Sequence, residues 1–424
     1  MQTADLIVSA RQVVTCAPGG SARSGHRMQE VGVIENGSVA MVKDRIVAVG
    51  PTAQVRRHWS GDHLELPDSS VIPGLVDAHS HPLFAGSRIG EFIMRARGAS
   101  YQEIHAAGGG IASTVKATCG ASDEELLRST CQVMERMLAH GTTTLEAKSG
   151  YGLAVEQELR HLRILRQAAE QVPVEVVTTC LGAHALPPEY ADRRQDFLRT
   201  VTDELLPAVC EQGLAEYSDV FCEVGAFTLE ESRQVLEASR DLGFGLRIHA
   251  EEFNYLGGAR MAAELGAATA DHLQCLRSDD FEALRAGGTI PVMIPGTSFF
   301  LDMDLYAPAR PLLEADLPVA LGTDFNAGSC MTESMPMSMA LAVIKMKMTP
   351  EEALLAATVN AAHSLGRGQR VGSLEVGKQA DLLVLDAPDW RHLVYRFGVN
   401  LVRVIIKNGV TVNTILTSPC GAPV

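Results

Sequence analysis

The sequence lacks the features that would direct it to a membrane or to nucleic acid. Its 424 residues hold no apolar run near the roughly 20 residues that a membrane-spanning helix needs. Lysine and arginine form no cluster, and the formal net charge of -15 disfavours nucleic acid and anionic membranes as partners. The first residues show no basic start followed by a long apolar stretch, so we expect no signal peptide. We therefore expect a cytoplasmic protein.

The nine cysteines show no Cys-x-x-Cys pair, and their number is odd. Cys180 and Cys222 fall in strand-like apolar runs, where a free thiol behaves as a small hydrophobic side chain. A disulfide framework is not expected in a chain of this length. Cys330 stands apart because it follows Asp324 closely, and the sequence leaves its role open.

What is present suffices for one large domain and a smaller one, since 46% of the residues are hydrophobic and 21% charged. Residues 1–70 and 368–424 contain short strand-like runs separated by turn residues. We expect these runs to pair as antiparallel strands in a small β-sandwich domain built from both chain ends. In residues 71–367, strand-like and helix-like runs alternate, which is typical of βα units and a parallel sheet.

The middle region predicts an α/β fold of the (β/α)8 TIM-barrel type. Residues 122–140 have apolar side chains at helical spacing, and Thr228 with Glu231 forms a capping box that predicts the start of another helix. In such barrels the chemistry lies at the carboxyl ends of the strands. The eight strand-like runs are 71–78, 142–146, 174–181, 219–223, 245–250, 268–272, 289–294 and 318–322.

Polar side chains collect where these predicted strands end. His79 and His81 are two residues apart at the end of the first strand, so both imidazoles point the same way. Imidazole and carboxylate groups suit zinc or iron. Because all strand ends of a barrel meet at one mouth, we predict a metal centre there. The further strand-end residues are His184, His249, His272 and Asp324.

Several segments resemble the amidohydrolase superfamily. Pro73-Gly74-Leu75-Val76-Asp77-Ala78-His79-Ser80-His81 is similar to that superfamily's first strand, and Gly322-Thr323-Asp324 to its eighth. Residues 372–382 resemble the segment that returns to the β domain. The resemblance spans the whole chain and implies the same barrel and β domain.

A narrower resemblance is to the imidazolonepropionases. It implies hydrolysis of the ring amide C–N bond of 4-imidazolone-5-propanoate to N-formimidoyl-L-glutamate, a step of L-histidine degradation. Two departures from the pattern, Glu251 and the Phe325 and Ala327 pair, concern substrate fit more than the metal. The segments that carry this resemblance are Arg88 with Glu91-Phe92, Gly108-Gly109-Gly110-Ile111, residues 146–153, His249-Ala250-Glu251-Glu252 and residues 323–329.

The chemistry of ring-amide hydrolysis assigns roles to the strand-end residues. A water bound to one zinc or iron ion per chain would supply the nucleophile. Asp324 would also take the proton of that water and pass it to the leaving nitrogen. His272 would stabilise the oxyanion, and Glu252 would orient substrate or water. The metal ligands would be His79, His81, His249 and Asp324.

Substrate recognition follows from the negative charge of a propanoate tail. Arg88 offers a planar, two-pronged donor for that carboxylate. Tyr151 lies in a glycine-rich loop, where the backbone can approach a ligand. His184 would hydrogen-bond a ring carbonyl or the carboxylate. The resemblance adds four further substrate contacts, namely Glu252, Asn326, Gly328 and Ser329.

Alternatives remain open at this stage. Some superfamily members hold two metals bridged by a carboxylated lysine or by a glutamate of the fourth strand, and Lys148 and Glu223 occupy such positions. We predict one metal, because the narrower resemblance is to a one-metal family. An aminohydrolase of a purine or related heterocycle would use the same ligands. A non-enzymatic assembly scaffold or a metal-storage protein would not need this open-sided site. The resemblance also implies a homodimer.

Overall fold

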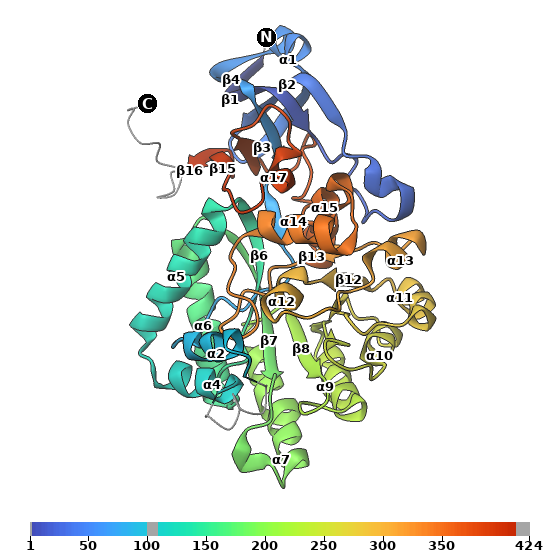
Figure 1. The fold of residues 1–424 in the computed structure, drawn as a ribbon. Helices are drawn as coiled ribbons and strands as arrows, with labels where there is room; N and C mark the ends of the chain where they lie inside the picture. The colour runs from blue at the N-terminus through green and yellow to red at the C-terminus, as the bar shows by residue number, and fades with distance from the viewer. Residues whose placement is uncertain (1, 100–108, 413–424) are drawn as a thin grey trace.

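A computed structural model describes residues 2–99 and 109–412 of the chain. These residues form two sheets, a small one and a barrel surrounded by helices (Figure 1). In Figure 1 the small sheet lies at one end of the molecule, and it contains both the first strand, β1, and the last, β16. Gly108 and residues 413–424, which the sequence analysis placed in a motif and in the small domain, lie outside the described residues.

The small sheet has seven strands in the order β16-β15-β14-β4-β1-β2-β3. All its pairs are antiparallel except β1 with β4, which run parallel. Buried aliphatic side chains from both ends of the chain, including Val8, Val39 and Leu382, form its core. The strands are β1 (Gln2–Val14), β2 (Val33–Val42), β3 (Arg45–Pro51), β4 (Trp59–Pro73), β14 (Leu382–Leu385), β15 (Val402–Lys407) and β16 (Val410–Val412).

The predicted eight-stranded parallel barrel is confirmed. Its fifth strand is interrupted, so that β9 and β10 both pair with β8. The first and last strands meet through backbone hydrogen bonds, of which Asp324 N–H to His79 O spans 2.9 Å. The strands are β5 (Leu75–Asp77), β6 (Thr142–Lys148), β7 (Glu175–Ala183), β8 (Tyr217–Cys222), β9 (Gly245–Leu246), β10 (His249–Ala250), β11 (Thr269–His272), β12 (Ile290–Met293) and β13 (Ala320–Leu321).

The first predicted barrel strand, 71–78, divides between the two sheets. Residues up to Pro73 belong to β4 of the small sheet, and the barrel begins at Leu75. Gly74 lies between them, and a Cβ there would fall 2.2 Å from Thr143 Oγ1. Only glycine allows this close approach to the neighbouring strand. The sequence did not reveal this boundary, because the end of β4 and all of β5 are buried and together form one continuous apolar run.

Helices cover the outside of the barrel (Figure 1). The helix predicted at 122–140 is α5, capped by Ser122, and Thr228 caps α9 in a capping box as predicted. Among the described residues, no helix combines the length and apolar character needed to cross a membrane. The helices are α1 (Thr52–His58), α2 (Ile89–Ala96), α4 (Ile111–Gly120), α5 (Asp123–Ala139), α6 (Val155–Gln171), α7 (Arg194–Arg199), α8 (Leu206–Glu211), α9 (Leu229–Asp241), α10 (Gly258–Glu264), α11 (Phe281–Gly287), α12 (Pro295–Phe300), α13 (Ala309–Glu314), α14 (Met335–Met346), α15 (Pro350–Ala356), α16 (Val359–Ser364) and α17 (His392–Tyr395).

Candidate metal centre and active site

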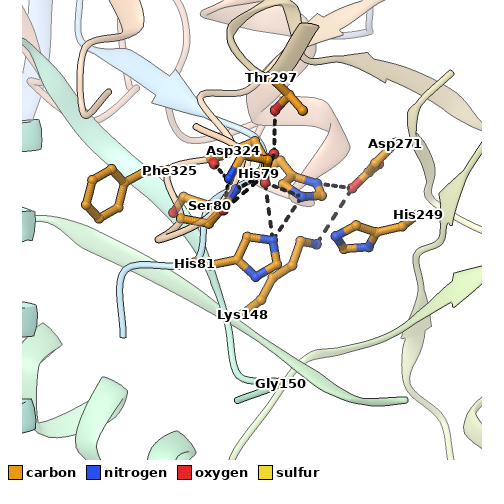
Figure 2. A network of polar contacts seen from close by, with 12 residues as sticks. His79, Ser80, His81, Lys148, Gly150, His249, Asp271, Thr297, Asp324 and Phe325 are labelled. Carbon is orange, nitrogen blue, oxygen red and sulfur yellow. Dashed lines mark hydrogen bonds and ion pairs between the residues drawn. The ribbon is translucent and has the colours of Figure 1, made fainter. Parts of the chain in front are cut away.

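Three of the predicted metal ligands meet where β5 and β13 end (Figure 2). The Nε2 atoms of His79 and His81 are 3.3 Å apart, and Asp324 Oδ1 lies 3.5 and 3.4 Å from them. Two ligands at about 2.1 Å from a tetrahedral zinc ion would be about 3.4 Å apart. All three side chains are buried. Their spacing therefore fits one small cation between them.

Two further histidines close the site from the neighbouring strands. The ring centroids of His249 and His272 lie 4.5 and 5.2 Å from that of His79. One nitrogen from each of these three rings falls within a 4.8 Å group. The Nε2 atoms of His249 and His272 are buried and have no hydrogen-bond partner among the described residues. The unpartnered nitrogen of His249 fits metal coordination, and that of His272 leaves this ring free to contact a substrate.

The charge states of three of the histidines and of Asp324 suit a metal as well. For His79, burial lowers the pKa, but the contacts with Asp271 and Asp324 outweigh it and raise that pKa. Burial lowers the pKa of His81 and His249, and it lowers that of His272 to about 4. These imidazoles are therefore neutral near pH 7, the form that coordinates metal ions. Burial raises the pKa of Asp324, but the neighbouring His79 and His81 outweigh it and hold that pKa well below its usual value. The donor set thus fits zinc or iron.

Two residues of the site have a strained backbone conformation. His272 has φ 80° and Asp324 has φ 52°, in the left-handed region that side chains other than glycine rarely adopt. Such a conformation costs about 1–3 kcal/mol per residue and persists where the surroundings enforce it. Asp77 provides part of that support, because its Oδ1 accepts the Thr323 N–H at 2.9 Å and its Oδ2 the Thr323 hydroxyl at 2.6 Å.

Two carboxylates behind the histidines were missed by the sequence analysis. Asp271 Oδ2 lies 2.6 Å from His79 Nδ1, and Asp219 Oδ2 lies 3.0 Å from His249 Nδ1. The hydrogen bond of Asp271 fixes His79 Nδ1 as the donor and turns Nε2 towards the metal, while Asp219 lies against His249 Nδ1 as a close charged neighbour. The available signal was a charged residue inside an apolar strand run, as in Asp219-Val220-Phe221.

Asp324 has another partner that the sequence did not reveal. Thr297, on α12, donates its hydroxyl to Asp324 Oδ2 at 2.5 Å (Figure 2). The side chain of Asp324 is thus held through both oxygens, with Oδ1 facing the histidines. The hydroxyl of Ser329 lies 3.5 Å from the same Oδ2. A threonine at the start of a short helix carries no distinctive sequence signal.

His184 and Tyr151 line the site beside His81. The His184 ring stacks on His81 with centroids 5.4 Å apart, and Tyr151 lies 5.3 Å from His184. His184 Nδ1 donates to Gly150 O at 2.9 Å, since a carbonyl only accepts. Burial lowers the pKa of His184 to about 3, so the ring is neutral. Its Nε2 is therefore an acceptor, which favours a substrate N–H as its partner over a carbonyl.

Arg88 makes a two-pronged pair within its own segment. Its Nε and Nη2 donate to the two oxygens of Glu91 at 2.9 and 2.8 Å. Nη1 points to Gly328, where a Cβ would fall 1.8 Å from it. Glycine at 328 therefore makes room for the guanidinium next to the loop that follows Asp324. The Glu91 carboxylate also accepts the Gly110 N–H at 2.9 Å.

The other predicted substrate contacts differ in whether their polar side-chain atoms already have hydrogen-bond partners within the protein. Asn326 Oδ1 accepts the N–H groups of Gly328 and Ser329 at 2.8 Å, and its Nδ2 donates to Asp324 O, so this side chain shapes the loop. Glu252 Oε1 lies 3.7 Å from His272 Nδ1. Burial raises the pKa of Glu252 well above its usual value. Glu252 is therefore a candidate proton carrier beside His272.

Glu223 and Cys330 have other surroundings. Glu223 accepts the N–H groups of Phe253 and Asn254 at 2.9 and 3.2 Å, so it holds the loop after β10.

Cys330 is buried, and burial raises the pKa of its thiol. A buried neutral thiol is a poor nucleophile.

A model of the amidohydrolase family matches residues 70–416 of the chain. The protein therefore belongs to the amidohydrolases. Two solved structures show the same fold. A zinc-bound adenosine deaminase from Xanthomonas campestris has 21% identity and a TM-score of 0.70, and the match covers 97% of this chain and 93% of that one. An atrazine chlorohydrolase from Arthrobacter aurescens complexed with zinc has 15% identity and a TM-score of 0.70, and the match covers 96% of this chain and 94% of that one.

Within the amidohydrolases, the similarity is much higher to curated imidazolonepropionases. The imidazolonepropionase of Geobacillus kaustophilus is 46% identical over 94% of this chain and 96% of its own length. That of Symbiobacterium thermophilum is also 46% identical, over 95% and 96%. The chain belongs to the imidazolonepropionase family, as the motifs in the sequence indicated.

Proposed function

We propose that this protein hydrolyses 4-imidazolone-5-propanoate to N-formimidoyl-L-glutamate in L-histidine degradation. The observation that carries the proposal is the meeting of His79, His81 and Asp324 at 3.3–3.5 Å, in a chain that belongs to the imidazolonepropionases. In this reaction the oxygen of water joins the ring carbonyl carbon, which becomes a carboxylate. The ring C–N bond breaks, and the leaving nitrogen takes up a proton.

His79, His81, His249 and Asp324 would hold one zinc or iron ion. When bound, such an ion polarises a carbonyl and lowers the pKa of water. Asp324 accepts the proton of the attacking water, because its low pKa keeps it ionised, and it then delivers that proton to the leaving nitrogen. Thr297 keeps the carboxylate oriented during this transfer.

His272 and Glu252 act on the carbonyl side. His272 hydrogen-bonds the oxygen that becomes negative as water adds, which lowers the energy of the tetrahedral state. Glu252, 3.7 Å from His272 Nδ1, orients that ring and carries a proton because its pKa is raised. In this arrangement Glu252 keeps its proton beside His272, while Asp324 alone takes the proton of water and passes it on.

The substrate is held by its charge and its ring. Arg88 binds the propanoate through Nη1, while Glu91 keeps the guanidinium in place. His184 accepts a ring N–H, and Tyr151 packs beside it. Gly328, Ser329 and Asn326 form the opposite wall.

The test of the reaction is ultraviolet absorbance of freshly prepared 4-imidazolone-5-propanoate with metal-assayed enzyme. Loss of the ring absorbance with the wild type is the expected result. Arg88→Gln should raise KM about 10–100-fold, because the charge-assisted contact of Nη1 with the propanoate is lost. The matched control is Arg194→Gln, since Arg194 forms the same kind of pair with Glu231 on the helical shell. A protein that deaminates a purine and leaves this substrate unchanged would overturn the proposal in favour of an aminohydrolase.

We also propose one metal ion per chain, a homodimer and a cytoplasmic location. Glu223 accepts hydrogen bonds from the loop after β10 on both of its oxygens, and Lys148 is paired with carboxylates. These contacts support a single ion, since neither side chain is free to bridge a second one. Elemental analysis should give one zinc or iron per chain. Sedimentation analysis should give twice the mass of the chain.

A further inference from the structure

Five charged side chains lie buried in the barrel beneath the candidate metal ligands. They come from β6, β8, β11 and the link between β9 and β10, and each is at most 1% exposed. Three are carboxylates and two are cations, so the group carries one net negative charge. Figure 2 shows the ammonium of Lys148, a residue of β6, directed towards Asp271 close to His249. The five residues are Glu146, Lys148, Asp219, Arg247 and Asp271.

Lys148 is the centre of this group. Its Nζ donates to Glu146 Oε1 and to Asp219 Oδ2, both at 2.7 Å, and lies 3.6 Å from Asp271 Oδ2. Arg247 also contacts the group. Its Nη2 donates to Asp271 Oδ2 at 3.3 Å and to Ala78 O at 2.6 Å. The ammonium thus joins carboxylates from three different strands.

Two of those carboxylates are the ones that touch histidines. Asp219 is the partner of His249, and Asp271 is the partner of His79. Lys148 therefore reaches two predicted metal ligands, each through one carboxylate. Buried ion pairs seldom stabilise a fold more than apolar side chains of similar size would, because charges lose their hydration on burial. The presence of this group in a barrel core is better explained by a role in the site.

We propose that Lys148 is a positioning residue whose ammonium takes the place of a second cation, holding Asp219 and Asp271 so that His249 and His79 present Nε2 to a single metal ion. The inference rests on the proposed function, because it needs the metal site. It also gives a reason for one ion rather than two. A carboxylated Lys148 would be an anion facing Glu146 and Asp219, which the observed contacts would repel.

The test compares two buried lysines. Lys407, on β15, pairs with Asp381 at 2.6 Å in the small sheet, so Lys407→Met removes a buried ion pair away from the barrel. Lys148→Met and Lys407→Met are each titrated with zinc against a chromophoric chelator. Visible spectra are recorded after cobalt substitution. Lys148→Met should weaken zinc binding about 10–100-fold and change the cobalt spectrum, as expected when the groups behind metal ligands are lost.

Lys407→Met should lower the melting temperature and leave both metal readouts unchanged. The proposal is overturned if Lys148→Met binds zinc within twofold of the wild type with the same cobalt spectrum, or if both variants weaken zinc binding equally. If Lys148→Met does not fold, Lys148→Gln, which keeps a donor and loses the charge, takes its place with the same criteria. Zinc binding by the wild type is measured first, so that failure of the proposed metal site is distinguished from failure of this inference.

Discussion

The barrel and the small sheet each bury a lysine against an aspartate, but the two pairs are connected differently. In the small sheet, Asp381 accepts Lys407 Nζ at 2.6 Å and the Asn408 N–H at 2.9 Å, so the pair closes the turn after β15. In the barrel, Asp219 accepts Lys148 and lies against His249. The same buried chemistry fixes a backbone turn in one region and an imidazole in the other.

The two regions also place strained backbone differently. In the small sheet, left-handed residues such as Asn36, Lys43 and Asn408 occur within a strand or at turns, away from the barrel mouth. The barrel has such residues outside the candidate site too, among them Asp302 and Asp316, but there His272 and Asp324 also adopt this conformation and are themselves candidate functional side chains. Strain that persists at such positions is a sign of selection for geometry rather than for stability.

The largest expected difference between the barrel and the small sheet is in the effect of replacing one aspartate in each, Asp324 and Asp381. Asp324→Asn should lower kcat at least about 10³-fold, because it removes a metal ligand and the proton acceptor together. Asp381→Asn should leave kcat per folded molecule unchanged and lower the free energy of unfolding by about 3–5 kcal/mol, because Lys407 loses its partner. Activity assays and urea unfolding measure both. Equal losses of activity would contradict the separation of the two regions.

Removing the metal should affect the barrel mouth first. Dialysis against a chelator should abolish hydrolysis, and addition of zinc or iron should restore it. The metal-free protein should also have a lower free energy of unfolding. The difference from the metal-bound protein should be about 3 kcal/mol when the free ion is present at 100 times its dissociation constant. Calorimetry with and without metal measures this difference. Full activity after complete removal of metal would contradict the candidate site.

A buried histidine on the barrel's helical shell should make stability depend on pH. Burial lowers the pKa of His161, on α6, from its ordinary value of 6.5 to about 4. Protons therefore bind the unfolded chain first as the pH falls below about 6.5, so stability is lost between that pH and about 4. From pH 7 to pH 5 this histidine should account for about 2 kcal/mol. His161→Leu should reduce the loss seen in urea unfolding at the two pH values, and an unchanged loss would contradict the assignment.

The smallest expected effect lies on the same shell. Ser122→Ala removes the cap of α5, where the hydroxyl accepts the Glu125 N–H, and should lower the free energy of unfolding by about 1 kcal/mol. Metal affinity should not change. Ser129→Ala, within the same helix, is the matched control and should have little effect. A change in zinc binding by Ser122→Ala would show that the shell and the mouth are coupled.

Much of the barrel was predictable because its strands are short apolar runs that end in polar residues. The histidine pair of β5 and Asp324 after β13 could be placed at one mouth from strand order alone. The division of 71–78 at Gly74 could not, because one apolar run serves two sheets. The long strand β4 was also missed, since its polar first half lacks the alternation of a half-buried strand.

The alternation of strands and helices, the donor types at the strand ends and the family were all readable from the chain's local patterns. Those follow from local patterns of apolar and polar residues, which each short segment carries independently. Two features became visible only in the folded molecule. Asp271, Asp219 and Thr297 lie behind His79, His249 and Asp324, and Glu91 holds Arg88. Most of these contacts join residues from different strands and helices. Their geometry is set by barrel closure, which no single segment encodes.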